Sequence, residues 1–312
     1  MNQPMNRDLH IGGQAVIEGV MMRSPQRMAI AVRNHQGGIS LKREELSSLT
    51  AKGGFWGWPL VRGAVVLVET LIIGIRALNW SAEIAMEEGR EKRDRKHGEK
   101  TGEAWAKLGT GLMTVFAFAL GLIIFMYIPY WLSRALKEAG QNQFVFHLIA
   151  GAIRMLFFLG YLYLISRWKE IRRIFEYHGA EHKSIFALEA GENLSPQSVA
   201  KYGTHHPRCG TSFILIVAVL AILFFALFDS VVVSVVGDYP NVGVRFLVHL
   251  PLIPLVAGIS YEVLKLSGEK RKSRLVALLS QPGLWLQKIT TLEPDEEQLE
   301  VALAALNAVL EK

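Results

Sequence analysis

Four long apolar runs alternate with polar stretches along the last two-thirds of the chain. They cover residues 111–132, 144–166, 211–236 and 242–266. Each run reaches the roughly 20 residues that a helix needs to cross the hydrocarbon core of a bilayer. The third run is the cleanest, because it carries no charged residue between Thr211 and Phe228. The pattern therefore predicts about four transmembrane helices, two within residues 111–166 and two within residues 211–266.

A fifth apolar segment, residues 59–85, is long enough to span a bilayer but has a different pattern. Its charged side chains recur every seven residues, at Arg62, Glu69, Arg76 and Glu83. That spacing places them on one face of a helix. An aromatic group precedes the segment and consists of Phe55, Trp56 and Trp58. We therefore predict an amphipathic helix that lies in the membrane interface or enters it as a re-entrant segment.

The polar segments predict a small α/β cytoplasmic portion. Residues 1–58 are β-rich, with apolar runs at 15–20 (AVIEGV) and 28–34 (MAIAVRN) and a turn at 35–38, which favours two or three strands. Residues 86–110 form a charged cytoplasmic helix with favourable i,i+4 pairs. The C-terminal tail, residues 267–312, is predicted to be helical and to end in an amphipathic helix. The predicted fold class is a mainly α-helical integral membrane protein.

Composition and charge agree with this fold class. Of the 312 residues, 51% are hydrophobic and 20% are charged, whereas soluble proteins average about 25% charged residues. Lysine and arginine number seven in the 167–210 loop and none in the 237–241 loop. Because basic loops remain cytoplasmic, we predict a multi-pass protein of the bacterial inner (plasma) membrane with both termini in the cytoplasm. No signal peptide is recognisable at the N-terminus, and no nucleic-acid-binding motif appears.

The 167–210 loop holds the residues with the clearest chemistry. His178, Glu181 and His182 form an H-x-x-E-H motif. On a helix the two histidines lie one turn apart and can bind one divalent metal ion, for which zinc is the leading candidate. Glu181 lies beside them, where a carboxylate can act as a general base or as a further ligand.

A second group follows about twenty residues later and contains His205, His206 and Cys209. Any of these three can supply a further ligand. Three protein ligands leave an open position, as in catalytic zinc sites, whereas four close the shell, as in structural sites. The alternative is that these histidines bind no metal and instead cap helices, contact lipid headgroups or pair with acidic side chains.

Polar residues inside the apolar runs form a separate group: Arg154, Asp229 and His249. Such residues are costly in lipid and usually face the interior of a helix bundle. Arg154 and Asp229 lie at depths where they can pair, and nearby prolines break the fourth run, as in transporter binding sites. Glu262, at the cytoplasmic end of the fourth run, is a candidate additional ligand or base.

Several motifs resemble an uncharacterised bacterial membrane-protein family of the YqhQ type. They are GGQAVIEGVMMR (12–23), YHGAEHK (177–183), HPRCGTSF (206–213) and TTLEPD (290–295). Members of that family are often labelled predicted metal-dependent enzymes. The resemblance implies functional positions at the histidine, glutamate and cysteine residues of the two central motifs, and adds Glu18 from the first motif as a possible further ligand. It implies no substrate and no reaction.

Three functions are therefore compatible with the sequence. The leading hypothesis is a metal-dependent hydrolase at the cytoplasmic membrane surface, acting on a membrane-associated substrate. The second is a non-enzymatic membrane scaffold or assembly factor whose metal, if any, is structural. The third is a small-solute or ion transporter that uses the intramembrane polar residues. The expected partners are the lipid bilayer and other membrane proteins, with no nucleic acid.

Overall fold

The computed structural model describes residues 11–86, 101–129, 131–132, 143–206, 209–269 and 274–311. Contacts divide the chain into two compact units. The first contains Met1–Glu88, Ile165–Ile216 and Ala257–Lys312, and the second contains Gly89–Leu164 and Val217–Val256. Each unit is described by itself. Most of the charged helix predicted over residues 86–110 lies outside the described residues.

A four-stranded antiparallel sheet forms the centre of the first unit. Its strands follow the chain in the order β1 (Gly12–Val16), β2 (Gly19–Arg23), β3 (Arg27–Arg33) and β4 (Ile39–Glu45). The stretch AVIEGV, predicted to be one strand, instead contains the β1–β2 turn, in which Glu18 adopts a positive φ of 51°. The turn predicted at 35–38 is confirmed, with Gly37 at a φ of 82°.

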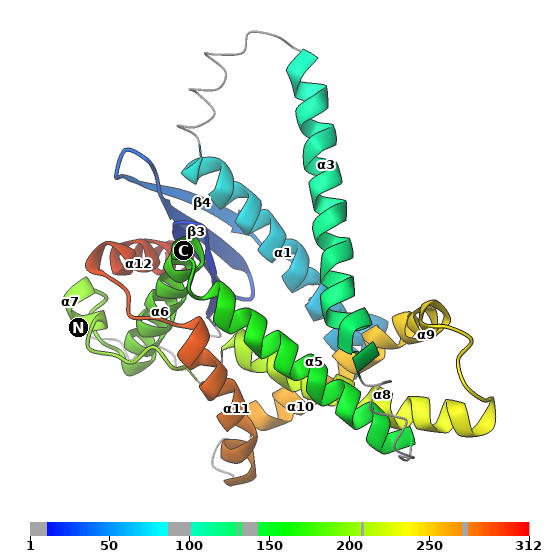
Figure 1. Cartoon of the computed structure of the whole chain (residues 1–312). Helices are drawn as coiled ribbons and strands as arrows, with labels where there is room; N and C mark the ends of the chain where they lie inside the picture. The colour runs from blue at the N-terminus through cyan, green and yellow to red at the C-terminus, as the bar shows by residue number, and fades with distance from the viewer. Residues whose placement is uncertain are drawn as a thin grey trace. The chain divides into compact units, whose positions relative to one another are not determined.

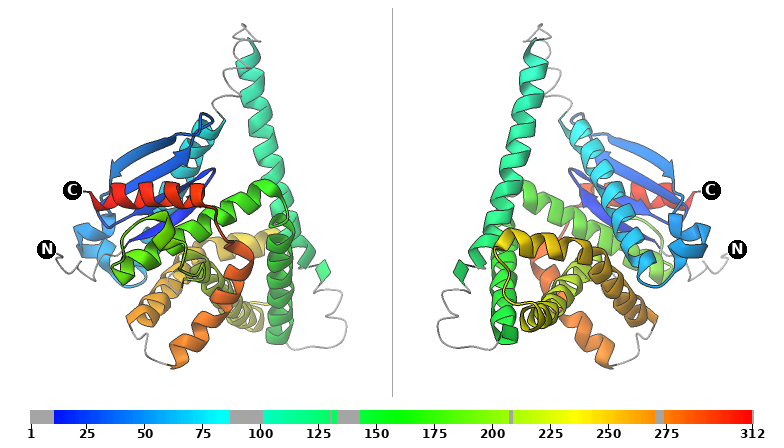
Figure 2. Two further views of the ribbon diagram at one scale, coloured as in Figure 1. Left: turned by 90° about the vertical axis from the view of Figure 1, so that its left-hand side faces the viewer. Right: turned by 90° about the vertical axis from the view of Figure 1, so that its right-hand side faces the viewer.

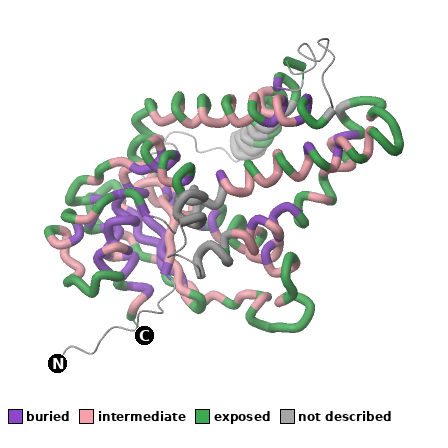
Figure 3. The backbone as a smooth tube through the Cα atoms, turned by 90° about the horizontal axis from the view of Figure 1, so that it is seen from below, coloured by how far each residue is buried: buried purple, intermediate pink, exposed green. Residues whose placement is uncertain are grey.

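Helices cover both faces of this sheet. Val20, Met22 and Ala29 point to the face packed against α6 (Lys169–Ala190) and α12 (Glu296–Leu310). Figure 1 shows these two helices beside the sheet. The alternate strand residues pack against α1 (Val61–Ala85) on the opposite face. Figure 2 shows α12 lying along the sheet, and Figure 3 shows buried backbone concentrated there. Burial on two faces explains why β2 and β3 are apolar without alternation.

The C-terminal amphipathic helix predicted from the sequence is confirmed as α12. Asp295 caps it, because its side chain accepts the N–H of Gln298 while the Gln298 side chain accepts the N–H of Asp295. Its apolar face is the one that packs on the sheet.

The remaining elements lie outside the sheet and outside helices α1, α6 and α12. They are η1 (Leu49–Lys52), η2 (Gly54–Gly57), α3 (Thr101–Leu122), the π-helical η3 (Ile123–Tyr127), α5 (Gln143–Ile165), α7 (Pro196–Val199), α8 (Gly210–Val235), α9 (Val242–His249), η4 (Leu250–Leu252), α10 (Ile253–Glu269) and α11 (Arg274–Thr290). The predicted 167–210 loop is thus largely helical, since α6 occupies half of it.

Three helices of the described chain are long and apolar enough to cross a bilayer: Phe144–Ile165, Leu215–Val235 and Gly243–Val263. The expectation of four spans is not matched. Among the described residues, the first predicted run supplies only a shorter apolar stretch, Gly111–Phe125.

The segment predicted over residues 59–85 is one continuous helix, α1, with no reversal of the kind that a re-entrant hairpin requires. It exposes a row of large apolar side chains: Val68, Leu71, Ile72 and Ile75. Its N-terminal turn crosses α10 closely, where a Cβ atom on Gly63 would stand 2.8 Å from the Cα of Gly258. Arg62 and Glu262 join the same two helices through paired hydrogen bonds, one of 2.7 Å.

Candidate metal centre

Helix α6 brings His178 and His182 together inside the first unit. The two residues are one turn apart, and their ring centroids are 4.5 Å from each other. Both side chains are buried, with exposed fractions of 9% and 1%. Gly179, between them, lets α6 approach the segment after α11, because a Cβ atom there would stand 1.9 Å from the Leu292 carbonyl oxygen. A glycine inside the motif therefore serves close packing.

Backbone carbonyl groups fix the orientation of both histidine rings. The Nδ1–H of His178 donates to the carbonyl oxygen of Thr290 at 2.8 Å, and the Nδ1–H of His182 donates to that of Thr204. Each ring therefore carries its lone pair on Nε2, the arrangement usual for metal-binding histidines. Burial lowers the pKa of His178 to about 4 and that of His182 to about 3. Both imidazoles are thus neutral at pH 7 and ready to bind a cation.

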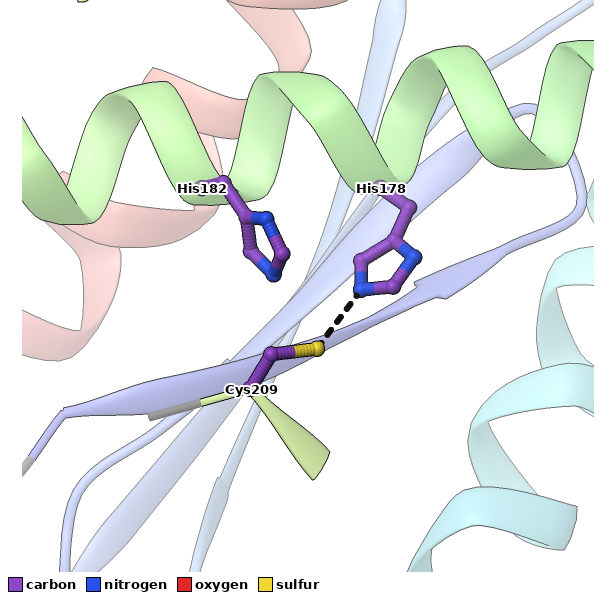
Figure 4. Close-up of side chains that lie close together, drawn as sticks. All are labelled: His178, His182 and Cys209. Carbon is purple, nitrogen blue, oxygen red and sulfur yellow. Dashed lines mark hydrogen bonds between the residues drawn. The ribbon is translucent and has the colours of Figure 1, made fainter. Parts of the chain in front are cut away.

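Cys209, just before α8, completes a group of three potential ligands (Figure 4). Its Sγ atom lies 3.2 Å from the Nε2 atom of His178. The three ligand atoms all lie within 4.8 Å of one another. Nitrogen and sulfur ligands around one tetrahedral zinc ion stand about 3.3–3.6 Å apart. The Nε2 atom of His182 is buried and has no hydrogen-bond partner. A cation bound to all three ligands would satisfy that atom.

Glu181 lies at the edge of this group. Its Oε2 atom is 3.9 Å from the Nε2 atom of His178, and its carboxylate accepts the backbone N–H of Gly13 in β1. A Cβ atom on Gly13 would stand 2.8 Å from the Cγ atom of Glu181, so glycine is needed for this approach. Burial raises the pKa of the Glu181 carboxyl to about 8. A carboxyl with such a pKa can exchange a proton near neutral pH.

The other two predicted histidines are not in the ligand group. His205 is exposed. His206 is buried, but its Nε2 atom lies 3.4 Å from a carboxylate oxygen of Glu189. Its backbone is held by Gln287 of α11, which accepts the His206 N–H at 2.8 Å and donates to the His206 carbonyl at 2.9 Å. Gln287 thus holds the backbone of residue 206 against α11.

The two additional candidate ligands, Glu18 and Glu262, occupy ion pairs elsewhere. Glu18 accepts two hydrogen bonds from the Arg173 guanidinium, at 2.6 and 2.5 Å. Glu262 accepts the pair of bonds from Arg62 that joins α1 to α10. The structure therefore brings together His178, His182 and Cys209, with Glu181 beside them.

The intramembrane polar residues lie in the second unit and make a different arrangement from the one expected. Asp229 is fully buried and pairs with Arg245 rather than with Arg154. It also accepts hydrogen bonds from His249 at 2.7 Å and from Tyr239 at 2.8 Å. Sequence reasoning missed Arg245, although an arginine four residues before His249 lies on the same helical face.

Several residues that support the metal centre were also missed. Gly13, Thr290 and Leu292 belong to motifs noted in the sequence, but nothing in one sequence links a backbone carbonyl to a distant histidine. Gln287 carried no signal, because an isolated glutamine in a helix is common. These contacts join segments from both ends of the chain, so spacing along the sequence does not predict them.

Comparisons with known proteins agree on one family. The model of DUF1385, a protein family of unknown function, matches residues 58–312 and so includes all three candidate ligands. The chain is 30% identical over 303 residues to the uncharacterized protein YqhQ of Bacillus subtilis (strain 168), an alignment covering 96% of this chain and 92% of that relative. No solved structure matches the chain.

Proposed function

The chain belongs to the DUF1385 family of proteins of unknown function, and from this premise and the site geometry we propose that it is a metal-dependent hydrolase of the bacterial inner membrane. The ligands are His178, His182 and Cys209, and the metal is a divalent ion, with zinc as the leading candidate. Glu181 is the general base. The substrate is a membrane-associated molecule that reaches the cytoplasmic surface.

One observation carries this proposal. Two backbone carbonyls fix both imidazoles in the tautomer that leaves Nε2 unprotonated, and these atoms face the thiol of Cys209. The unsatisfied Nε2 atom of His182 would be costly in a buried site without a partner. Soft sulfur and imidazole ligands together suit zinc better than magnesium or calcium.

The proposed catalytic role follows from the number of ligands. Three protein ligands would leave a position for substrate or water, and a divalent metal held there would supply Lewis-acid chemistry. The Oε2 atom of Glu181 lies 3.9 Å from the Nε2 atom of His178. The N–H of Gly13 donates to the same carboxylate and orients it. Glu181 is placed to accept a proton from a water molecule and return it to a leaving group.

The proposed location rests on the three apolar helices and on the distribution of basic residues. Cys209 directly precedes α8, which contains the Leu215–Val235 candidate span. A site there lies within two helical turns of the membrane surface. That proximity supports a substrate that is itself lipid-linked or embedded in the membrane.

A second candidate function, a scaffold with a structural metal, is supported by the connectivity of the site. The ligands and their carbonyl partners come from α6, the Thr204 segment, the start of α8 and the end of α11. A metal bound there would fasten four segments together without catalysing a reaction. The two candidates differ in whether the metal keeps an open coordination position.

Metal content of the full-length, detergent-purified chain tests the shared premise. Elemental mass spectrometry should find about one zinc per chain in the unmodified protein, in Glu181→Gln and in the control His35→Ala, which alters an exposed turn. His182→Ala and Cys209→Ala should each lose the metal. Retention of the metal by both ligand variants, or its absence from the unmodified protein after zinc reconstitution, would overturn the site.

Cobalt substitution then separates the hydrolase from the scaffold. A thiolate ligand gives Co²⁺ a charge-transfer absorption, which should be present in the unmodified protein and absent from Cys209→Ala. Azide should change the visible spectrum if a position is open. A spectrum that azide leaves unchanged would indicate a closed shell, contradict the hydrolase and favour the scaffold.

A further inference from the structure

A cavity of about 460 Å³ lies within the second unit and is separate from the metal centre. It is within the size range of small-molecule sites, about 300–1,000 Å³. Helices α5, α8 and α9, together with η3 and the segment that follows α9, contribute its walls. Most of its lining is aromatic or aliphatic, including Phe125, Met155, Phe158, Phe225, Phe246 and Ile253. Such a lining accepts an apolar chain.

Around the cavity, guanidinium groups outnumber carboxylates among the residues that the structure describes. Arg154, Arg245, His147 and His249 line it. The nearby carboxylate of Asp229 is already bound by Arg245, His249 and Tyr239. The Arg245 guanidinium also lies 3.2 Å from the Nδ1 atom of His147. One carboxylate therefore faces two guanidinium groups.

Arg154 is the group left without a direct partner. Within the part of the chain that the structure describes, its guanidinium forms no hydrogen bond and no ion pair, and Asp229 and Arg245 act on it only at longer range. A partly buried guanidinium among apolar side chains is costly unless an anion pairs with it. Carboxylates and phosphates satisfy guanidinium best, because they accept two parallel hydrogen bonds.

From the apolar lining and this unbalanced arginine we propose that the cavity binds an anionic amphiphile. The carboxylate or phosphate head pairs with Arg154, and the hydrocarbon chain occupies the apolar part between α5 and α8. The site is independent of the metal centre, because none of its lining residues belongs to the first unit. Its two parts select for different features of one ligand, namely the charge of the head and the length of the chain.

Native mass spectrometry of the full-length chain in detergent tests this proposal with matched probes. Oleate and dioleoyl phosphatidate supply the two anionic heads, and oleyl alcohol and dioleoylglycerol are the neutral analogues with the same chains. Inorganic phosphate supplies a head without a chain. The unmodified protein should bind at least one anionic amphiphile at least tenfold more tightly than its neutral analogue and more tightly than inorganic phosphate. The preferred head identifies the source of the charge.

Two variants assign the binding to the cavity. Arg154→Gln should remove the preference for the anionic probes, and Ala221→Phe, which fills the cavity, should weaken binding of every chain at least tenfold. The control Arg76→Gln, on the exposed face of α1, should bind as the unmodified protein does. Equal binding of charged and neutral probes, or an unchanged preference in Arg154→Gln, would overturn the proposal. If Arg154→Gln does not fold, the Ala221→Phe result decides, since unweakened binding there also overturns it.

Discussion

The α-carbon of Gly179 packs directly on the carbonyl oxygen of Leu292, with no room for a Cβ atom between them. The Leu292 N–H in turn donates to the carbonyl of Phe175 at 2.9 Å. The segment after α11 therefore contacts α6 at two points. One is Phe175, about one turn before His178, and the other is Gly179, directly after His178. This packing places the Thr290 carbonyl where it can orient His178.

We expect Gly179→Ala to destabilise the fold by about 1–3 kcal/mol, even though alanine is the better helix former. The methyl group would push the backbone of Leu292 away, since a carbonyl in the main chain cannot rotate aside as a flexible side chain does. Thermal unfolding in detergent measures the effect. Gly160→Ala in α5 is the matched control, because nothing lies near a Cβ atom there. An equal melting temperature for the two variants would contradict the packing argument.

Because the Glu181 carboxyl is buried, we predict that the metal-free protein loses stability as the pH rises. Its pKa is raised from 4.5 to about 8 by burial, so the folded state holds the proton more tightly than the unfolded state. The stabilisation is complete below pH 4.5 and is lost as the pH rises towards 8, with an upper limit of about 1.4 kcal/mol per pH unit. Glu181→Gln removes this loss. The stability of the variant relative to the unmodified protein should therefore increase between pH 5 and 8.

Thermal melts of chelator-treated protein across that pH range measure the difference. The control Glu192→Gln removes an exposed carboxylate beyond the end of α6 and should follow the unmodified protein. Parallel curves for Glu181→Gln and the unmodified protein would show that the carboxyl ionises without cost. Added zinc should flatten the dependence, because a nearby cation stabilises the carboxylate.

The ion pair between Glu18 and Arg173 predicts a modest, purely structural effect. Both side chains are partly exposed, at 29% and 46%, and exposed pairs contribute about 0.2–1 kcal/mol. Glu18→Gln should therefore lower stability slightly and leave the metal content unchanged. Loss of metal in this variant, measured beside His182→Ala, would return Glu18 to the ligand set.

Labelling of newly introduced cysteines tests the predicted topology directly, because the chain has a single cysteine that can first be replaced. In a Cys209→Ser background, Asp238→Cys in the loop after α8 should react with a membrane-impermeant maleimide in intact bacterial cells. Lys201→Cys, an exposed position beyond α7, should react only after the cells are lysed. The reverse pattern would invert the orientation, and labelling of both in intact cells would contradict a membrane between them.

Local patterns along the sequence predicted some parts of the structure well. The heptad of charges in residues 59–85 predicted a helix, and the apolar face of residues 294–311 predicted a packed C-terminal helix. The H-x-x-E-H spacing predicted two histidines on one helical face, which α6 confirms. Each of these inferences depends on residues that recur at the spacing of a helix, which is a signal local to one segment of the sequence.

Features that depend on distant contacts were not predictable. The reversal at Glu18 has no turn signature inside AVIEGV, since Gly19 follows the positive-φ position instead of occupying it. The partner of Asp229 was misjudged, because depth along a helix does not give rotation around it. The contact between Gln287 of α11 and the His206 backbone joins residues 81 positions apart, so spacing along the sequence does not indicate it.

The order of synthesis has a consequence for how this chain must fold. Arg33, at the end of β3, donates to the carbonyl oxygen of Glu297 in α12 at 2.7 Å, although the two residues are 264 positions apart. At ribosomal rates of about 5–20 residues per second, tens of seconds separate the emergence of the sheet from that of the helix that covers it. The apolar helices emerge in that interval. The face of the strands that packs against both α6 and α12 is therefore only partly covered until translation ends. A ribosome that stalls before residue 296 produces a chain in which part of this hydrophobic face stays exposed.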